Sequence, residues 1–166
     1  MSNELQHCRI DRLPPQVMLE FVAYPSAGRN DDALWPQGPG AVRRDARQQP
    51  LLLHFAPGRW LVPDPSAETR ALLEHAADGG NGDVVDVTGK WEALMLTGPG
   101  AGRLLACDVA VEEVLKDREC AAISLFDAPA TVARASGGYA IWVQSSYLTD
   151  CIACLERFRA SLESHD

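Results

Sequence analysis

The stretch that decides the fold is VVDVTGKWEALMLTGPGAGRLLACDV, residues 84–109. In its first half, Val85 and Val87 share one face and alternate with polar residues, which is the period-two pattern of a half-buried strand. A turn is predicted at Gly89, and the alternation resumes over residues 91–97. The sequence therefore predicts two successive strands.

A Gly-Pro turn and a short apolar helix follow these strands. Pro99 suits the first position of that helix, because its missing N–H has no intrahelical partner there. Leu104 and Leu105 supply an apolar stripe for the core. The run GPGAG precedes a helix as a phosphate-binding loop does, but it fits neither G-x-G-x-x-G nor the Walker pattern. Pro99 also removes one amide donor, so we interpret the run as a turn.

This unit, with FAPGRWLV before it and GGYAIWVQSSYLTDCIACLERF after it, resembles the gamma subunit of heterotetrameric sarcosine oxidase. The matching positions are Pro57, Trp60 and Leu61; Asp86, Thr88 and Trp91; Leu94, Leu96, Thr97, Gly98, Pro99 and Ala101; and Ser146 and Tyr147. The resemblance extends over residues 51–158 and is thin before Pro50.

Other patterns fill the rest of the chain. Residues 1–22 predict an edge strand within VMLEFVAY, and residues 23–50, rich in Pro, Gly and Asp, predict an extended arm or loop. A hairpin is predicted over residues 51–63, followed by a helix that Asp64 or Ser66 caps, with Pro65 at its first position. Towards the C-terminus, the predicted elements are strands at residues 121–126, 131–135 and 139–144 and a last helix that begins at Ser146.

This order of elements indicates an α+β fold, with a sheet covered by helices on one face. Sarcosine oxidase gamma subunits are similar to the folate-binding domain of the glycine-cleavage aminomethyltransferase. The resemblance therefore implies a ferredoxin-like βαββαβ core with extra strands. With 166 residues, of which 46% are hydrophobic, the chain is long enough for one domain spanning residues 1–166.

The resemblance also implies a function. The chain is expected to be a noncatalytic structural subunit of a complex that oxidatively demethylates an N-methylated amine and passes the one-carbon unit to tetrahydrofolate. Its partners would be alpha, beta and delta-type subunits, which would bind FAD, FMN, NAD and tetrahydrofolate; this chain is expected to bind no cofactor. Two alternatives stay open: a stand-alone folate-binding or one-carbon-transfer protein, and an orphan scaffold paralogue.

Charge and hydropathy restrict the other classes of function. A formal net charge of −8 argues against a nucleic-acid surface, because phosphate binding depends on clustered Lys and Arg. No apolar run approaches the ~20 residues that span a bilayer, and no secretory leader pattern is present at the start. The chain is expected to be cytoplasmic, with its five cysteines reduced.

No constellation of residues predicts a catalytic or metal site. The four histidines, at positions 7, 54, 75 and 165, are scattered. Cys151 and Cys154 form a C-x-x-C, but they lie in an amphipathic helix with no second pair of ligands, so Cys151 is expected in the core. Asp127 lies near the position of a folate-related acid in the aminomethyltransferase relatives. The flanking glycines and second acid are absent, so we interpret Asp127 as a turn residue.

An interface is predicted within residues 23–50. Trp35 lies in a Pro/Gly-rich stretch with little core to join, and such aromatics are typical anchors at interfaces. Arg43 and Arg44 open RRDAR, the basic cluster of this stretch, which suits a partner that carries carboxylates. Trp60, Trp91 and Trp142 are instead expected in the core.

Overall fold

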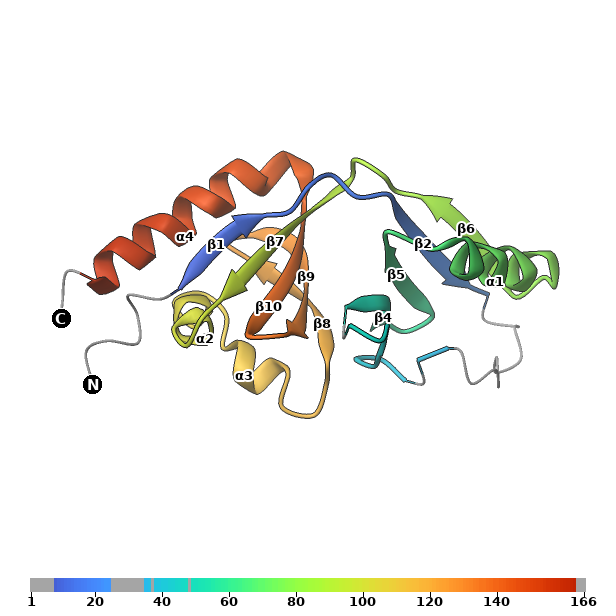
Figure 1. The fold of residues 1–166 in the computed structure, drawn as a ribbon, viewed down its shortest axis with the longest axis horizontal. Helices are drawn as coiled ribbons and strands as arrows, with labels where there is room; N and C mark the ends of the chain where they lie inside the picture. Colours follow the sequence, from blue (N-terminus) through green and yellow to red (C-terminus); the bar gives the residue numbers. More distant parts are fainter. Residues whose placement is uncertain (1–7, 25–34, 37, 48, 164–166) are drawn as a thin grey trace.

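The computed structural model describes residues 8–24, 35–36, 38–47 and 49–163. Ten strands in this part of the chain form two five-stranded antiparallel sheets (Figure 1). Sheet A has the order β1 (Arg9–Arg12), β7 (Trp91–Thr97), β10 (Gly138–Gln144), β9 (Ala128–Ala135) and β8 (Cys120–Leu125). Sheet B has the order β3 (Val42–Arg44), β4 (Pro50–Ala56), β5 (Arg59–Pro63), β2 (Met18–Ala23) and β6 (Gly82–Asp86).

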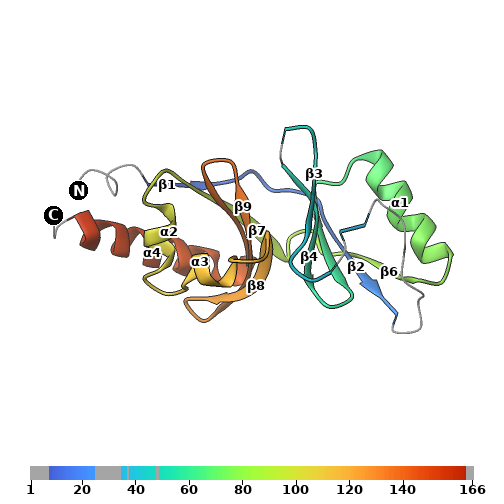
Figure 2. The ribbon, with the colours of Figure 1, turned by 90° about the horizontal axis from the view of Figure 1, so that it is seen from below.

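Helices cover the outer face of each sheet, and the inner faces pack against one another (Figures 1 and 2). The helices are α1 (Ala67–Asp78) on sheet B, and α2 (Ala101–Leu105), α3 (Val111–Val114) and α4 (Leu148–Glu163) on sheet A. A core cluster between the sheets includes Met18, Leu53, Leu61, Trp91, Ala140 and Trp142. The α+β class is confirmed, but the sequence pattern predicted one sheet and the structure has two. None of the helices in the described ranges is long and apolar enough to cross a bilayer.

The N-terminal region serves both sheets, which corrects the prediction of a single edge strand. β1 is the edge strand of sheet A, paired with β7. β2 lies inside sheet B, between β5 and β6. The prediction was wrong for β2 because both of its sides are paired, and all of Met18–Phe21 is consequently buried.

The two strands of the opening stretch belong to different sheets. The chain leaves sheet B after β6, turns at Gly89 (φ 81°) and enters sheet A at β7. Val87 is buried as the alternation predicts, but Val85 is 43% exposed. The face of β6 that carries Val85 was predicted to be buried, and this is wrong. β6 is the edge strand of sheet B, and its opposite face, with Val84, packs into the cluster under α1.

The hairpin of β4 and β5 and the helix after it follow the sequence prediction closely. Ser66 caps α1 and accepts a 3.1 Å hydrogen bond from the Thr69 amide. Pro65 precedes the cap, so it is not the first helical residue. Because β5 and β6 flank β2 and are joined through α1, they form a split β-α-β unit of the ferredoxin-like kind.

Two further helix starts and the predicted arm need correction. The Ala101 amide donates to the Gly98 carbonyl at 3.1 Å, so Pro99 occupies a β-turn and α2 begins two residues after it. The last helix is preceded by the 3-10 turn η2 (Ser145–Tyr147), which begins one residue before the predicted Ser146. Within the predicted arm, Val42–Arg44 forms β3; residues 25–34 lie outside the described ranges.

The three C-terminal strands are confirmed. β8 and β9 are joined by Phe126 and Asp127, which both have positive φ (49° and 64°). Two residues with positive φ make the tight hairpin turn that matches strand twist, and Asp tolerates this conformation better than most residues. Asp127 is therefore a turn residue, at the centre of the turn rather than at its start.

Candidate functional site

The three residues of the predicted interface lie in different surroundings. Trp35 is 4% exposed and packs on Phe21 and Trp60, with ring centroids 4.8 and 5.2 Å away. The expectation that Trp35 has little core to join is therefore wrong, because it helps to close the outer face of sheet B. Arg43 and Arg44 lie in β3, at the edge of that sheet. Contact of these three residues with a partner stays a prediction.

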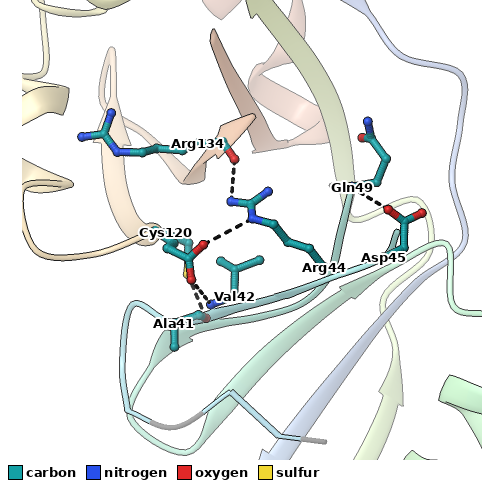
Figure 3. Close-up of polar contacts among 8 residues, drawn as sticks. Ala41, Val42, Arg44, Asp45, Gln49, Cys120 and Arg134 are labelled. Atoms are coloured by element: carbon teal, nitrogen blue, oxygen red, sulfur yellow. Dashed lines mark hydrogen bonds and ion pairs between the residues drawn. The ribbon is translucent and has the colours of Figure 1, made fainter. Parts of the chain in front are cut away.

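Arg44 connects the two sheets (Figure 3). Its Nε donates to Glu119 Oε1 at 3.3 Å, and its Nη2 donates to the Arg134 carbonyl at 2.8 Å. Glu119 also accepts a hydrogen bond from the Val42 amide at 3.2 Å. The bulge between Arg43 and Arg44 shifts the register of β3 against β4 next to this contact. Sheet B is thus attached through its edge strand to the β8–β9 side of sheet A.

The backbone before β3 strengthens this connection. The Gly40 carbonyl accepts hydrogen bonds from the amides of Glu119 and Cys120, at 2.8 and 3.0 Å. Gly40 has φ 97°, a left-handed backbone conformation that favours glycine, and a Cβ there would lie 2.8 Å from the side chain of Arg118. Both the conformation and the lack of space therefore favour glycine at this position. Cys120 is fully buried, and burial raises the pKa of its thiol to about 12, so the thiol stays protonated near neutral pH.

Removing the Arg44 side chain is expected to destabilise the protein. Arg44→Ala deletes a hydrogen bond to a carboxylate and one to a carbonyl from a side chain that is 15% exposed, so we expect a loss of about 2 kcal/mol in the free energy of unfolding. Urea denaturation measures it. Arg47→Ala, at an exposed position three residues later, is the control and should change stability by less than about 0.5 kcal/mol. Equal effects of the two variants would contradict the connecting role.

Arg134 also organises a polar cluster on its other side. Its Nη2 donates to Glu112 Oε2 at 3.0 Å and to the Leu115 carbonyl at 3.2 Å. The Tyr139 hydroxyl donates to Glu112 Oε1. This hydrogen bond, followed by that from Arg134, lowers the pKa of Glu112. Burial and the same carboxylate raise the pKa of Tyr139 to about 12, so near neutral pH Tyr139 stays an uncharged donor while Glu112 stays ionised.

Three adjoining pockets meet at Arg134, and we call them together the Arg134 groove. The largest, of about 720 Å³, lies between α2, α3 and the β9–β10 turn. The second, of about 450 Å³, follows the segment between α3 and β8. The third, of about 350 Å³, is lined, among the residues that the structure describes, by Arg44, Arg47, Arg134, Ala135 and Ser136. The charged residues of the groove are Arg44, Arg47, Arg103, Glu112, Lys116, Asp117, Arg118, Glu119 and Arg134.

Arg44 was predicted from the sequence, whereas Arg134, the residue at the centre of the groove, was not. Arg134 is the one charged residue in the eight of β9, APATVARA, and a lone arginine in an otherwise apolar strand was the available signal. Its partners Glu112 and Glu119 lie in a segment interpreted as a plain connection between a helix and a strand. Nothing in that segment's pattern distinguishes these two from its other acids.

The remaining candidate residues occupy structural positions. Cys151 is 1% exposed in the core and its thiol donates to the Leu125 carbonyl, while Cys154 is half-buried on α4, as predicted. In the described ranges no group of three or more His, Cys, Asp or Glu side chains is arranged to hold a metal ion. His7 and His165 lie outside those ranges, and His75 is exposed on α1.

His54 is a buried histidine whose protonation is coupled to folding. It is 6% exposed and stacks on Trp60, with ring centroids 4.3 Å apart. Burial lowers its pKa, and the backbone carbonyls of Gly38 and Pro36 only partly oppose this. Between the lowered pKa and about 6.5, the unfolded chain binds the proton more readily than the folded one. The free energy of unfolding therefore decreases as the pH falls through this window.

Replacing His54 tests this coupling. His54→Phe keeps an aromatic ring on Trp60 and removes the titrating group, so the loss of stability between pH 8 and pH 5.5 should be smaller than in the unchanged protein. Each tenfold weakening of proton binding in the folded state lowers the free energy of unfolding at low pH by up to about 1.4 kcal/mol. Urea denaturation at the two pH values measures the difference. His75→Gln, at an exposed histidine on α1, is the control; if it altered the pH dependence as much as His54→Phe, the assignment to His54 would fail.

Comparison with known proteins gives a likeness of fold. No protein-family model matches the chain, and no curated protein matches its sequence. A protein of unknown function from Vibrio cholerae, described as a possible transport protein, aligns at 15% identity over 94% of this chain and 93% of its own, but with a TM-score of only 0.39. A chain of the heterotetrameric sarcosine oxidase of Corynebacterium sp. U-96, solved in complex with pyrrole 2-carboxylate, aligns at 17% identity with a TM-score of 0.75. The alignment covers 94% of this chain and 85% of that one, so the two share their fold over nearly their whole lengths.

Proposed function

We propose that this chain is a noncatalytic, gamma-type structural subunit of a sarcosine oxidase-like complex that oxidatively demethylates an N-methylated amine in the cytoplasm. The observation that carries the proposal is the TM-score of 0.75 to a chain of a heterotetrameric sarcosine oxidase, over most of both chains. Because the likeness of fold covers most of both chains, it supports a relation between two whole chains. It does not suggest that this chain corresponds to one domain of a larger subunit.

Two sets of residues add support. The positions of the sarcosine oxidase gamma resemblance include residues that shape the connection between the sheets: Thr88 accepts a 3.0 Å hydrogen bond from the Met18 amide, and Trp91 lies in the core between the sheets. Cysteine and glutamate side chains that could take part in catalysis are also engaged in structural contacts. Cys120 and Cys151 are buried thiols with raised pKa values, and Glu112 is held by Tyr139 and Arg134.

In the proposed complex, alpha, beta and delta-type subunits bind FAD, FMN, NAD and tetrahydrofolate. This chain contributes a rigid shape to the assembly and no reacting group. The substrate's N-methyl group is oxidised and its one-carbon unit is transferred within those partners.

Co-expression tests the proposal. The tagged chain is produced together with alpha, beta and delta-type subunits of a sarcosine oxidase, and purified material is analysed by size-exclusion chromatography with light scattering. We expect a complex of fixed stoichiometry with amine-dependent oxidase activity. A chain that elutes alone while the other subunits assemble without it would sink the proposal. Calorimetric titration of the isolated chain with tetrahydrofolate gives a second reading, because tight binding there would favour the one-carbon-transfer alternative.

A further inference from the structure

We infer that the Arg134 groove binds an extended acidic segment of a partner protein. The inference rests on the proposed function in one respect, namely that the chain works beside other subunits. It adds to that function the place of contact and the chemistry of what is bound.

Charge is unevenly distributed between the groove and the rest of the chain. The groove is lined by six cationic and three acidic side chains, which gives it a formal charge of +3. The whole chain carries −8, so the rest of it carries −11. A uniformly acidic protein repels acidic partners, whereas a local basic groove in an acidic surface attracts and orients them.

The cations of the groove are of two kinds. Arg44 and Arg134 form ion pairs with Glu119 and Glu112, and Arg44 reaches from β3 to the Arg134 carbonyl (Figure 3). Arg47, Arg103, Lys116 and Arg118 are exposed, and none of these four forms an ion pair with any residue that the structure describes. The groove therefore combines fixed guanidinium groups with several cations that are available to incoming carboxylates.

The shape of the groove also restricts what it can bind. The three pockets share Arg134: one extends toward α2, one toward the turn after β3, and one along residues 39–41 and 115–119. The cations come from separate elements around Arg134, with Arg103 in α2, Arg134 in β9 and Arg47 after β3. A single small anion occupies one of these pockets, but an extended chain with several carboxylates reaches cations in more than one of them. This favours a peptide segment as the occupant.

The test uses the full chain and a labelled probe. A fluorescein-labelled twelve-residue peptide of alternating Glu and Ser, and its Gln counterpart, are titrated with the protein at low salt, and anisotropy is measured. We expect saturable binding of the Glu peptide that weakens steeply with added salt, because exposed charges are screened. The Gln peptide should not bind.

A pair of double variants locates the site. Arg47→Glu/Arg103→Glu reverses two exposed groove cations and is expected to weaken Glu-peptide binding at least tenfold. Arg70→Glu/Arg157→Glu makes the same change in net charge on α1 and α4, away from the groove, and should change binding less than twofold. Circular dichroism checks that both variants fold.

Three outcomes would overturn the inference. The first is equal weakening by the two double variants, which would mean unspecific attraction, and the second is binding of the Gln peptide. The third is half-displacement of the Glu peptide by citrate or phosphate, at constant ionic strength, at concentrations below the Kd of the peptide, which would mean a small-anion site. Failure of this test leaves co-assembly untouched, because the co-expression experiment reports on the complex whichever surface holds it together.

Discussion

Trp35→Ala is expected to lower the free energy of unfolding of the isolated chain by about 3–5 kcal/mol, the usual cost of truncating a buried Trp or Phe. Trp35 is 4% exposed, and its ring contacts those of Phe21 and Trp60. Its removal leaves a cavity against β2 and β5 on the outer face of sheet B. Urea denaturation of the isolated chain, followed by tryptophan fluorescence and circular dichroism, measures the change.

This result separates a core residue from an interface anchor. An anchor that is exposed in the isolated chain has little effect on its stability, and its loss weakens only the complex. Trp35→Phe is the matched control, because it keeps an aromatic ring in the cluster, and less than half of the alanine effect is expected. Unchanged unfolding of Trp35→Ala together with weakened co-assembly would restore the interface interpretation that the sequence suggested.

The case of Trp35 shows where sequence reasoning succeeded and where it failed. Local patterns predicted most of the elements correctly, including β7, the β4–β5 hairpin and the Ser66 cap, because each depends on periodicity or on a capping side chain. The pattern gave no information on which strands pair over long distances. β1 and β2 are five residues apart in sequence but lie in different sheets, and only the tertiary fold decides that.

The same limit applies to the candidate site. Arg44 was identified because it lies in a visible basic cluster, yet its contacts are with residues 75 and 90 positions away. Arg134, Glu112 and Glu119 are ordinary charged residues in the sequence, and they become a site only where β9 and β8 meet β3. A groove assembled from four separate segments has no local motif, which is why its parts were not predicted together.

Gly138→Ala is expected to destabilise the chain by about 3 kcal/mol or more, and it acts at the wall of the groove. A Cβ at this position would lie 1.9 Å from the Leu96 carbonyl oxygen and 3.0 Å from the Thr97 Cα. Both obstacles are backbone atoms of β7, which Gly138 pairs with in register, so no side-chain rotation relieves the contact. Overpacking typically costs about 1–3 kcal/mol, and a backbone obstacle puts this case at or above the upper end, because β10 has to separate from β7.

The neighbouring glycine provides the control, because it is required for a different reason. Gly137 has φ 75° and nothing within 4 Å of its missing Cβ, so Gly137→Ala costs only the strain of a left-handed backbone, about 1–2 kcal/mol. Gly137→Asn should cost less, since Asn tolerates that conformation. Thermal and urea unfolding of the three variants should rank Gly138→Ala as the most damaging. If Gly137→Ala were the worse variant, β10 would not lie against β7 as closely as the structure shows, and the groove wall formed by the β9–β10 turn would be in a different place.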